Sequence, residues 1–313
     1  MDIKQAATEY LKSIKRLTDG TRRGYEQRLG VFIEWCVEHN IELAEIRNVA
    51  VDDFVEYLRA HHHSAYHSRS EVSTHTLAGY VRVIKVFLAY CLEDEKISQQ
   101  VSESAVRRIK LPKRTKNIVQ IFSEQDIQAL FKACNQEFDV HLQERDRAIL
   151  SVLLDTGVRA AELCGLTIEH AHLEADDPHI KVLGKGSKWR EVGLGKLSRE
   201  ALQYYITTYR ADAVATSKVF IGRYNEPLTV SGLEKLIMRL GKFAAITNVR
   251  CSPHSFRHTF AVKYLLAGGD VFKLSLLMGH EDTRITTTHY LRTVQSMQIR
   301  RDARSVLDEM QIS

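Results

Sequence analysis

Apolar residues recur at helical spacing in three segments of the first third of the chain. Spacings of three and four residues place such side chains on one face of a helix. Glycine and proline are scarce here, and no alternating strand pattern competes. Residues 1–110 are therefore predicted to form a small helical bundle. The three stripes are Tyr25, Leu29, Phe32 and Cys36, then Val51, Phe54, Val55 and Leu58, and then Leu77, Val81, Ile84, Leu88 and Cys91.

A second domain is predicted from residue 120 onward. Ser123 and Asp126 form a capping-box pattern directly ahead of an apolar helical stripe. Another helix is expected over residues 145–155, and Gly157 follows its end. Because glycine readily adopts the backbone conformation that ends a helix, the chain should turn there into a short further helix.

The pattern changes to short strand-like runs between His179 and Gly193. Ile180 and Val182 precede a turn sequence at residues 184–187, and a second apolar pair follows it. Two short strands around a glycine-bearing turn predict a hairpin, and the chain beyond Ser198 is expected to be helical again. The predicted fold class is mainly α, with a helical N-terminal domain and a mixed, mostly helical C-terminal domain that contains a small β-sheet or hairpin.

A run of positive charge separates the two predicted domains. The sequence RRIKLPKRTK holds six basic residues and no acidic one, and Pro112 prevents a regular helix from continuing through it. The net charge of the chain is only +5, so the distribution tells more than the total. The predicted boundaries are 1–110 for the bundle, 111–119 for a basic linker and 120–313 for the second domain. The basic residues, called the strap below, are Arg107, Arg108, Lys110, Lys113, Arg114 and Lys116.

Several classes of protein do not fit this sequence. No stretch of about 18 apolar residues occurs, and the N-terminus lacks the basic start and apolar run of a secretory signal. Five widely spaced cysteines are typical of thiols in a reducing cytosol, so a cytoplasmic protein that does not enter a membrane is expected. No zinc-ligand spacing is present, and no metal site is predicted. The one histidine cluster, interpreted as a polar helix end and loop, is His61, His62, His63 and His67.

The second domain carries a series of basic, imidazole and phenol side chains in short distinctive segments. Each alone would be an ordinary surface, capping or packing residue. Together they supply what phosphoryl transfer needs, namely a nucleophile, a proton donor for the departing oxygen and cationic donors for the phosphate oxygens. The candidates are Arg159 in TGVRAAEL, Lys185 in GKGSK, His254 and Arg257 in HSFRHTFA, His280 in MGHED, and Tyr290 in THYLR.

This order resembles the tyrosine recombinase, or phage integrase, family, whose catalytic domain carries Arg, Lys, His-x-x-Arg, His or Trp, and then Tyr. The resemblance covers about residues 119–292, whereas residues 1–110 share only the helical character of the family's core-binding domain. It implies an enzyme that cuts and rejoins DNA strands without metal, ATP or another cofactor. The segments that are similar around the candidates are 156–163, 184–188, 257–261 and 277–280.

The resemblance also implies a role for each candidate. Arg159 and Arg257 grip the scissile phosphate, because planar guanidinium forks match phosphate oxygens in paired hydrogen bonds. Lys185 protonates the departing 5′ oxygen from a flexible hairpin tip. His254 helps to move the hydroxyl proton of Tyr290, since an imidazole changes charge near neutral pH.

The remaining candidates have supporting roles in the same scheme. His280 hydrogen-bonds the phosphate or steadies the pocket, Glu162 orients active-site residues, and His258 belongs to the surrounding shell. Attack by Tyr290 leaves a 3′-phosphotyrosyl enzyme that retains the energy of the phosphodiester bond. ATP is then unnecessary, and residues 184–187 have neither the length nor the spacing of a Walker-type loop.

Double-stranded DNA is the implied partner, clamped between the two domains with the strap along its backbone. Phosphate contacts of that kind give affinity and position but little sequence information; a solvated linker is the alternative interpretation of the strap. About 23 residues follow Tyr290 and predict a partly amphipathic tail helix. In the family such tails dock on a neighbouring subunit, which implies a homo-oligomer, dimer to tetramer, on DNA; a tail folded back on its own domain is the alternative. Its possible apolar contacts are Val294, Met297, Val306, Leu307 and Met310.

Two competing functions remain open at this point. One is a relative that relaxes DNA or forms hairpins with the same phosphotyrosine chemistry but exchanges no strands. The other is a DNA-binding regulator or accessory protein of the same fold. The complete candidate set argues against the second, because a pure binding protein needs neither Lys185 nor Tyr290. The recombinase function that the resemblance implies includes resolving, integrating or excising DNA.

Overall fold

The computed structural model describes residues 2–61, 72–113, 119–184, 186–210, 216–280 and 282–302, without the side chains of 285, 288, 289 and 299–302. The chain divides into two compact units, Met1–Asn117 and Ile118–Ser313, and the division falls inside the predicted linker. The sequence-predicted residues that lie outside the described ones are His62, His63, His67, Arg114, Lys116, Lys185 and the tail beyond residue 302.

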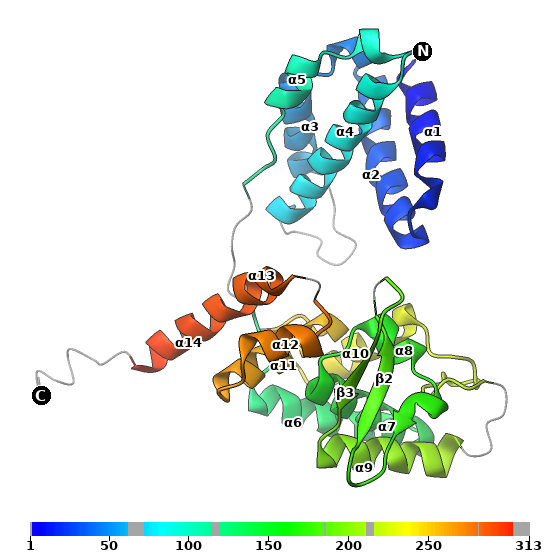
Figure 1. Ribbon diagram of the computed structural model, residues 1–313, viewed down its shortest axis with the longest axis vertical. Helices are drawn as coiled ribbons and strands as arrows, with labels where there is room; N and C mark the ends of the chain where they lie inside the picture. Colours follow the sequence, from blue (N-terminus) through cyan, green and yellow to red (C-terminus); the bar gives the residue numbers. More distant parts are fainter. Residues whose placement is uncertain are drawn as a thin grey trace, which may run out of the picture. The chain divides into compact units, whose positions relative to one another are not determined.

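The first unit is a helical bundle around an aromatic core. The three predicted stripes form the buried faces of α2, α3 and α4, where Phe32, Phe54 and Phe87 are fully buried. One further helix, α1, begins at a capping box between Asp2 and Gln5 and packs against the same core. The helices of this unit (Figure 1) are α1 (Ile3–Ser13), α2 (Asp19–Glu38), α3 (Asn48–His61), α4 (Thr74–Glu93) and α5 (Glu103–Arg108).

Helix α4 is the most apolar helix of the bundle. By length and composition alone this helix could cross a membrane, but half of its most apolar stretch is buried inside the unit. The buried side chains include Leu77, Ile84 and Leu88, which belong to the core. This is the pattern of the central helix of a bundle, whose apolar faces pack against its neighbours.

The second unit is mostly helical, as predicted. Its first helix begins at the expected capping box, in which Ser123 and Asp126 bond each other's backbone N–H. α7 starts five residues earlier than predicted, because the Asp139 side chain caps it, and ends at Gly157 in the left-handed conformation. The helices (Figure 1) are α6 (Glu124–Ala133), α7 (Val140–Thr156), α8 (Ala160–Gly165), α9 (Lys196–Tyr205), α10 (Val230–Phe243), α11 (Pro253–Leu266), α12 (Val271–Leu277), α13 (Thr283–Thr286) and α14 (Arg292–Asp302).

A small antiparallel sheet accompanies these helices. The predicted hairpin is present as β2 (His179–Leu183) and β3 (Trp189–Gly193), with Leu183 opposite Trp189 beside the connecting turn. A third strand, β1 (Ala171–His172), pairs with β2 and was not predicted. A two-residue strand is too short to show a periodic pattern in the sequence. β1 forms by pairing with the edge of the hairpin at β2. The mainly α fold class with a small sheet is confirmed.

Candidate active site

One turn of α11 presents three of the candidate side chains. The Ser252 side chain accepts from the backbone N–H of Ser255, and Pro253 occupies the first turn, where its missing N–H costs nothing. His254, Arg257 and His258 follow at positions i, i+3 and i+4 of that helix. Residues at those intervals share one face, so the segment HSFRH projects two imidazoles and a guanidinium in one direction.

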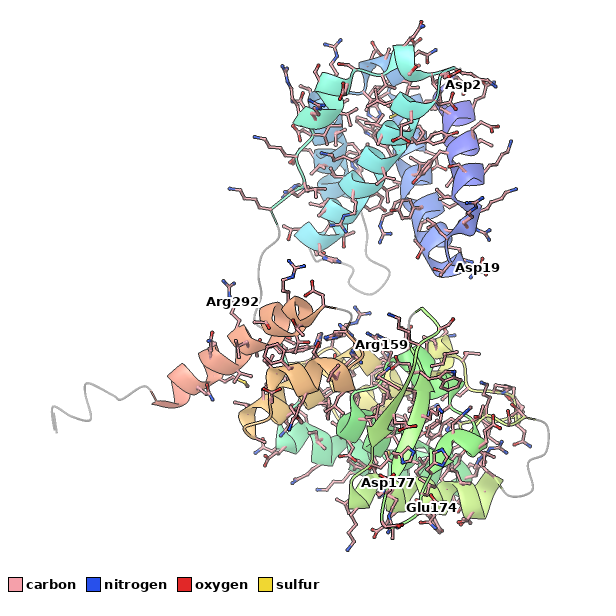
Figure 2. All side chains as sticks on the ribbon, in the orientation of Figure 1. Asp2, Asp19, Arg159, Glu174, Asp177 and Arg292 are labelled. Carbon is pink, nitrogen blue, oxygen red and sulfur yellow. The ribbon has the colours of Figure 1, made fainter. Side chains whose placement is uncertain are left out.

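The turn between α7 and α8 supplies the second arginine. Gly157 has φ +60°, and a Cβ atom there would lie 2.3 Å from Cδ1 of Phe260. Only glycine fits, which lets the chain reverse tightly and begin α8. Arg159 is the residue just before that helix, and its backbone N–H donates to Glu162 at 2.7 Å. In Figure 2 Arg159 lies at the end of the second unit opposite to Asp177 and Glu174.

Glu162 joins two arginines. Its Oε1 accepts from Nη1 of Arg159 at 2.8 Å, and its two oxygens accept from Nη1 and Nη2 of Arg190 at 2.7 and 2.8 Å. Burial by itself raises the pKa of Glu162, but the bonds from Arg190 and from the Arg159 backbone outweigh it and lower that pKa to about 2. Glu162 is therefore a fixed anion, as its predicted supporting role requires, and it cannot act as a base near neutral pH.

The turn after α12 is held by three arginines at once. Nε of Arg190 donates to the carbonyl oxygen of Leu277 at 2.9 Å. Nη2 of Arg257 donates to that of Met278 at 2.6 Å, and Nη2 of Arg159 donates to that of Gly279 at 2.9 Å. Three consecutive carbonyl dipoles thus offset the charge of the cluster, and the turn that carries His280 is fixed against it.

Arg257 is the most deeply buried cation of this cluster, with 3% of its surface exposed. Besides Met278 it donates through Nη1 to the carbonyl oxygen of Gly157 at 2.6 Å. Burial, and then repulsion from Arg159, lowers the pKa of Arg257 to about 10, so the guanidinium stays charged at neutral pH. A buried cation beside a second cation creates a site in which an anion is stabilised.

His280 lies between Arg257 and the start of the tyrosine segment. Its Nε2 is 2.9 Å from Nη2 of Arg257, and its Nδ1 is 2.7 Å from the hydroxyl oxygen of Thr286. Because a guanidinium can only donate, Nε2 accepts, and the proton of the neutral ring sits on Nδ1 and points to Thr286. This ring therefore ties the arginine cluster to the end of α13.

Tyr290 lies in a π-helical turn, Thr287–Leu291, between α13 and α14. Such turns widen a helix by one residue and are frequent at functional sites. The side chain is 97% buried, and its hydroxyl is 3.0 Å from Nδ1 of His258. Burial raises the pKa of Tyr290, whereas the charges of Arg257 and Arg159 lower it. A raised pKa means that the phenol needs a proton acceptor before it can attack, and His258 is in position to be one.

The structure brings most of the sequence-predicted residues together. Arg159, Glu162, Arg257, His280, His258 and Tyr290 are linked by the contacts above. His254 reaches the tyrosine's neighbour, since its ring centre lies 4.0 Å from that of His258. The hydroxyl contact is therefore made by the residue assigned to the surrounding shell, a different arrangement from the one that the sequence suggested.

One member of the cluster was missed by the sequence reasoning. Arg190 stands on β3 between two exposed residues, Trp189 and Glu191, and its basic side chain resembles a surface residue of a hairpin. The only available signal was its register, because it stands opposite the buried Val182 and so faces the interior. A charge at an inward position is unusual enough to merit attention.

In the described part of the chain, no group of three or more His, Cys, Asp or Glu side chains gathers in a way that could hold a metal ion. His61, the described member of the histidine cluster, has its Nδ1 3.0 Å from the carbonyl oxygen of Tyr57, as expected for a helix end.

Comparison with known proteins identifies the family. The model of the phage integrase family matches residues 120–296, and that of the phage integrase SAM-like domain matches residues 3–109. The tyrosine recombinase XerD of Pseudomonas aeruginosa is 32% identical over 283 residues, which cover 89% of this chain and 89% of that protein. The chain therefore belongs to the phage integrase family, and its enzymatic class is that of the tyrosine site-specific recombinases.

Solved structures share the fold. A XerH site-specific recombinase bound to palindromic difH substrate, in a post-cleavage complex, matches with a TM-score of 0.72 and 18% identity, over 94% of this chain and 82% of that one. A lambda integrase (75–356) dimer bound to a COC′ core site matches with a TM-score of 0.67 and 14% identity, over 91% and 97%. Both span the helical bundle and the second unit.

Proposed function

We propose that this chain cleaves and rejoins double-stranded DNA at specific sites with Tyr290 as the nucleophile. The observation that carries the proposal is the convergence of Arg257, Arg159 and Tyr290, whose phenol is sensitive to the charges of both guanidinium groups and contacts His258. Attack on a phosphodiester makes use of each of these groups, because it needs a nucleophile, a proton acceptor and cations beside the phosphate oxygens. Residues 1–110 act as the core-binding domain, and residues 120–313 carry the catalysis.

The reaction balances without an external energy source. The Tyr290 oxygen attacks the scissile phosphorus, its proton passes to an imidazole, and the bond from phosphorus to the 5′ oxygen breaks. Lys185 gives the 5′ oxygen its proton, while Arg159 and Arg257 stabilise the added charge on the phosphate oxygens. Rejoining is the reverse, with a 5′ hydroxyl attacking the 3′-phosphotyrosyl bond.

His258 is the proton acceptor that we favour over His254. The support is the 3.0 Å separation between its Nδ1 and the Tyr290 hydroxyl. His254, one turn earlier on α11, packs against the His258 ring and assists by orienting it. His280 holds Arg257 and, once phosphate replaces a carbonyl partner, can turn its ring toward the substrate.

The test is a covalent trap. The sequence of the probe comes from the DNA that co-purifies with the protein in a covalent complex that resists denaturant. The probe is a nicked duplex of that sequence, because a nick lets the cut end diffuse away and prevents rejoining. In EDTA, the wild-type protein should form a protein–DNA adduct and Tyr290→Phe should form none. His258→Gln should slow adduct formation more than His254→Gln. If Tyr290→Phe still forms the adduct, Tyr290 is not the nucleophile.

The same substrates distinguish the two alternative functions. Strand exchange between two sites is expected for a recombinase. Adduct formation with relaxation of a supercoiled plasmid, but without exchange, would identify a strand-relaxing relative. Specific DNA binding without any adduct would identify a regulator and would overturn the proposal.

The strap contributes to DNA binding by contacting phosphates. Arg107, Arg108, Lys110 and Lys113 support this, because they end α5 and continue beyond it as a run of cations; Arg107 also pairs with Glu103 at 2.6 Å. Arg114 and Lys116 complete the strap in our proposal. Replacing Arg107, Arg108, Lys113 and Arg114 with glutamine should flatten the dependence of DNA affinity on salt, and an unchanged slope would remove the strap from the interface.

Assembly on DNA is proposed to use the tail of each chain. Val294 on α14 is buried in the core of its own unit and Met297 packs against that core, so these residues pack on their own unit, and we propose that the segment beyond residue 302 docks on a neighbouring chain. Truncation after residue 302 should therefore leave cleavage intact but abolish cooperative assembly on paired sites. Retained cooperativity would contradict the proposal that the tail docks on a neighbouring subunit.

We further propose that the protein acts in the cytoplasm and associates with the nucleoid while it is active.

A further inference from the structure

Arg190 is the described side chain of the cluster to which the proposed reaction gives no task. It projects from β3 with only 14% of its side chain exposed, and every nitrogen of its guanidinium is engaged inside the protein. Nη1 and Nη2 hold the two oxygens of Glu162 in a bidentate pair, and Nε holds the carbonyl oxygen of Leu277. Arg190 therefore affects the site through the protein groups that it holds.

The partners of Arg190 are, however, those that orient the phosphate-binding arginine. Glu162 receives both the backbone N–H and Nη1 of Arg159. Its carboxylate can hold Arg159 in one orientation only if the carboxylate is itself fixed, and the fork from Arg190 fixes both of its oxygens. One anion is thus shared between two cations, with the buried arginine on one side and the more exposed Arg159 on the other.

Arg190 also lies against the turn that carries His280. A Cβ atom added to Gly279 would lie 3.0 Å from Nη1 and 3.2 Å from Cζ of Arg190. Gly279 has φ +61°, so the backbone conformation favours glycine there, and any other side chain would also crowd this arginine. The next residue is His280, whose ring reaches Arg257.

The position of Arg190 on the hairpin adds a third link. It pairs with Val182, one step inside the Leu183 and Trp189 pair that closes the ladder. The turn end of the hairpin is therefore attached to α8 and to the turn after α12 through a single guanidinium. Separate elements that must act on one phosphate are held in register at this point.

We propose that Arg190 is a positioning residue for strand cleavage, which acts through Glu162 to orient Arg159 and through the Leu277–Gly279 turn to place His280. This inference rests on the proposed function. Arg190 itself does not touch the DNA. A misplaced guanidinium costs transition-state stabilisation rather than ground-state affinity, because the phosphate gains its extra charge only during the reaction.

The first test separates cleavage from binding and from folding. Arg190→Gln should lower the single-turnover rate of adduct formation on the nicked duplex on the order of 100-fold, with DNA affinity within about threefold of wild type. Arg190→Lys keeps the charge but not the fork, and should fall between the two. The matched control is Arg210→Gln, because Arg210 is at least as buried as Arg190 and bonds backbone carbonyls of residues 216–219 elsewhere in the unit. Its adduct rate should stay near wild type.

The second test measures the pH dependence of the rate of adduct formation and the coupling between Arg190 and Glu162 in a double-mutant cycle. A purely structural role of Arg190 predicts neither a changed pH dependence nor coupling. Without Arg190, burial raises the pKa of Glu162 unopposed by its strongest partner, so the ratio of the Arg190→Gln rate to the wild-type rate should fall toward acid pH. In a Glu162→Gln background the further change Arg190→Gln should cost little, within about threefold, because residues that act as one unit are not additive.

The outcomes distinguish a failure of the proposed function from a failure of the proposed role of Arg190. A wild-type protein that forms no adduct refutes the proposed function itself. An active wild type with an Arg190→Gln rate within about twofold of it refutes only the role of Arg190. Equal losses of rate, affinity and melting temperature in Arg190→Gln and Arg210→Gln, with additive losses in the cycle, also refute it, because they mean that Arg190 serves only to stabilise the fold.

Discussion

The two units treat electric charge in opposite ways. In the described part of the first unit no charged side chain is buried, and the ion pairs join exposed residues one helical turn apart, as between Lys12 and Glu9 or Arg107 and Glu103. Among the described residues of the second unit, five charged side chains are buried. They are Arg145, Asp146, Glu162, Arg210 and Arg257.

The difference shows where the fold carries a cost for chemistry. Burying a charge is unfavourable unless partners compensate for it. Arg145 and Arg210 are compensated by backbone carbonyls of residues 216–221 and, for Arg145, by Asp146, so they fix loops. In the active site, by contrast, cations outnumber the single carboxylate of Glu162. An excess of like charge, rather than burial alone, distinguishes a site that awaits an anion from a structural ion pair.

The largest expected effect is on the cation at the centre of that excess. Arg257→Lys keeps the positive charge but replaces a planar fork by a single ammonium group. We expect the single-turnover rate of adduct formation to fall by about 100-fold to 1,000-fold, as for the loss of one preorganised donor. Quenched-flow trapping on the nicked duplex measures it.

The control for this change is Arg210→Lys. Arg210 is as buried as Arg257 and also donates to backbone carbonyl groups, but it lies outside the candidate active site. It should lose stability with little change in cleavage rate. Equal rate losses in the two variants would mean that charge excess does not mark the site.

A smaller effect is expected from the buried anion. The pKa of Glu162 is about 2 in the folded chain against a usual value of 4.5. Because the folded-state pKa is the lower one, this carboxylate contributes stability that is present above pH 4.5 and is lost as the pH falls toward 2. The contribution at neutral pH is about 3 kcal/mol.

Urea unfolding of the full chain and of Glu162→Gln measures this contribution. The difference in free energy of unfolding should be largest near neutral pH and should shrink as the pH falls from 4.5 toward 2. Asp146, whose pKa burial raises to about 6, is present in both proteins and cancels. A difference that does not change with pH would show that Glu162 stabilises the fold by packing and not by charge.

The same contrast explains how much could be predicted from the sequence. The first unit follows from its apolar stripes, because its helices are held by side chains that the period of the sequence reveals. Even α1 carries a readable signal, with Ile3, Ala6, Ala7 and Tyr10 on one face. In the second unit the capping box at Ser123, the turn at Gly157 and the hairpin were equally readable, because local backbone requirements determine them.

The residues of the candidate active site were named from the sequence, but their geometry was not. Arg159, Arg257 and Tyr290 follow from an order of residue types along the chain. The contact of His258 with Tyr290 depends on a π-helical turn that no pattern announces. Arg190 was missed because its partners, Glu162 and Leu277, are 28 and 87 residues away. Such pairs form only when the fold is complete.

The smallest effect is expected for an ion pair of the first unit, and it completes the comparison. Glu103 and Arg107 pair at 2.6 Å, but 65% and 78% of their side chains are exposed. Water competes for both charges, so Glu103→Gln should change the free energy of unfolding by no more than about 0.5 kcal/mol, and added salt should remove even that. Urea unfolding at low and high salt, run beside Glu162→Gln, gives the ratio directly. If Glu103→Gln and Glu162→Gln change the free energy of unfolding by equal amounts, burial does not determine how much a charged side chain contributes to stability. The contrast between the exposed charges of the first unit and the buried charges of the second would then have no energetic meaning.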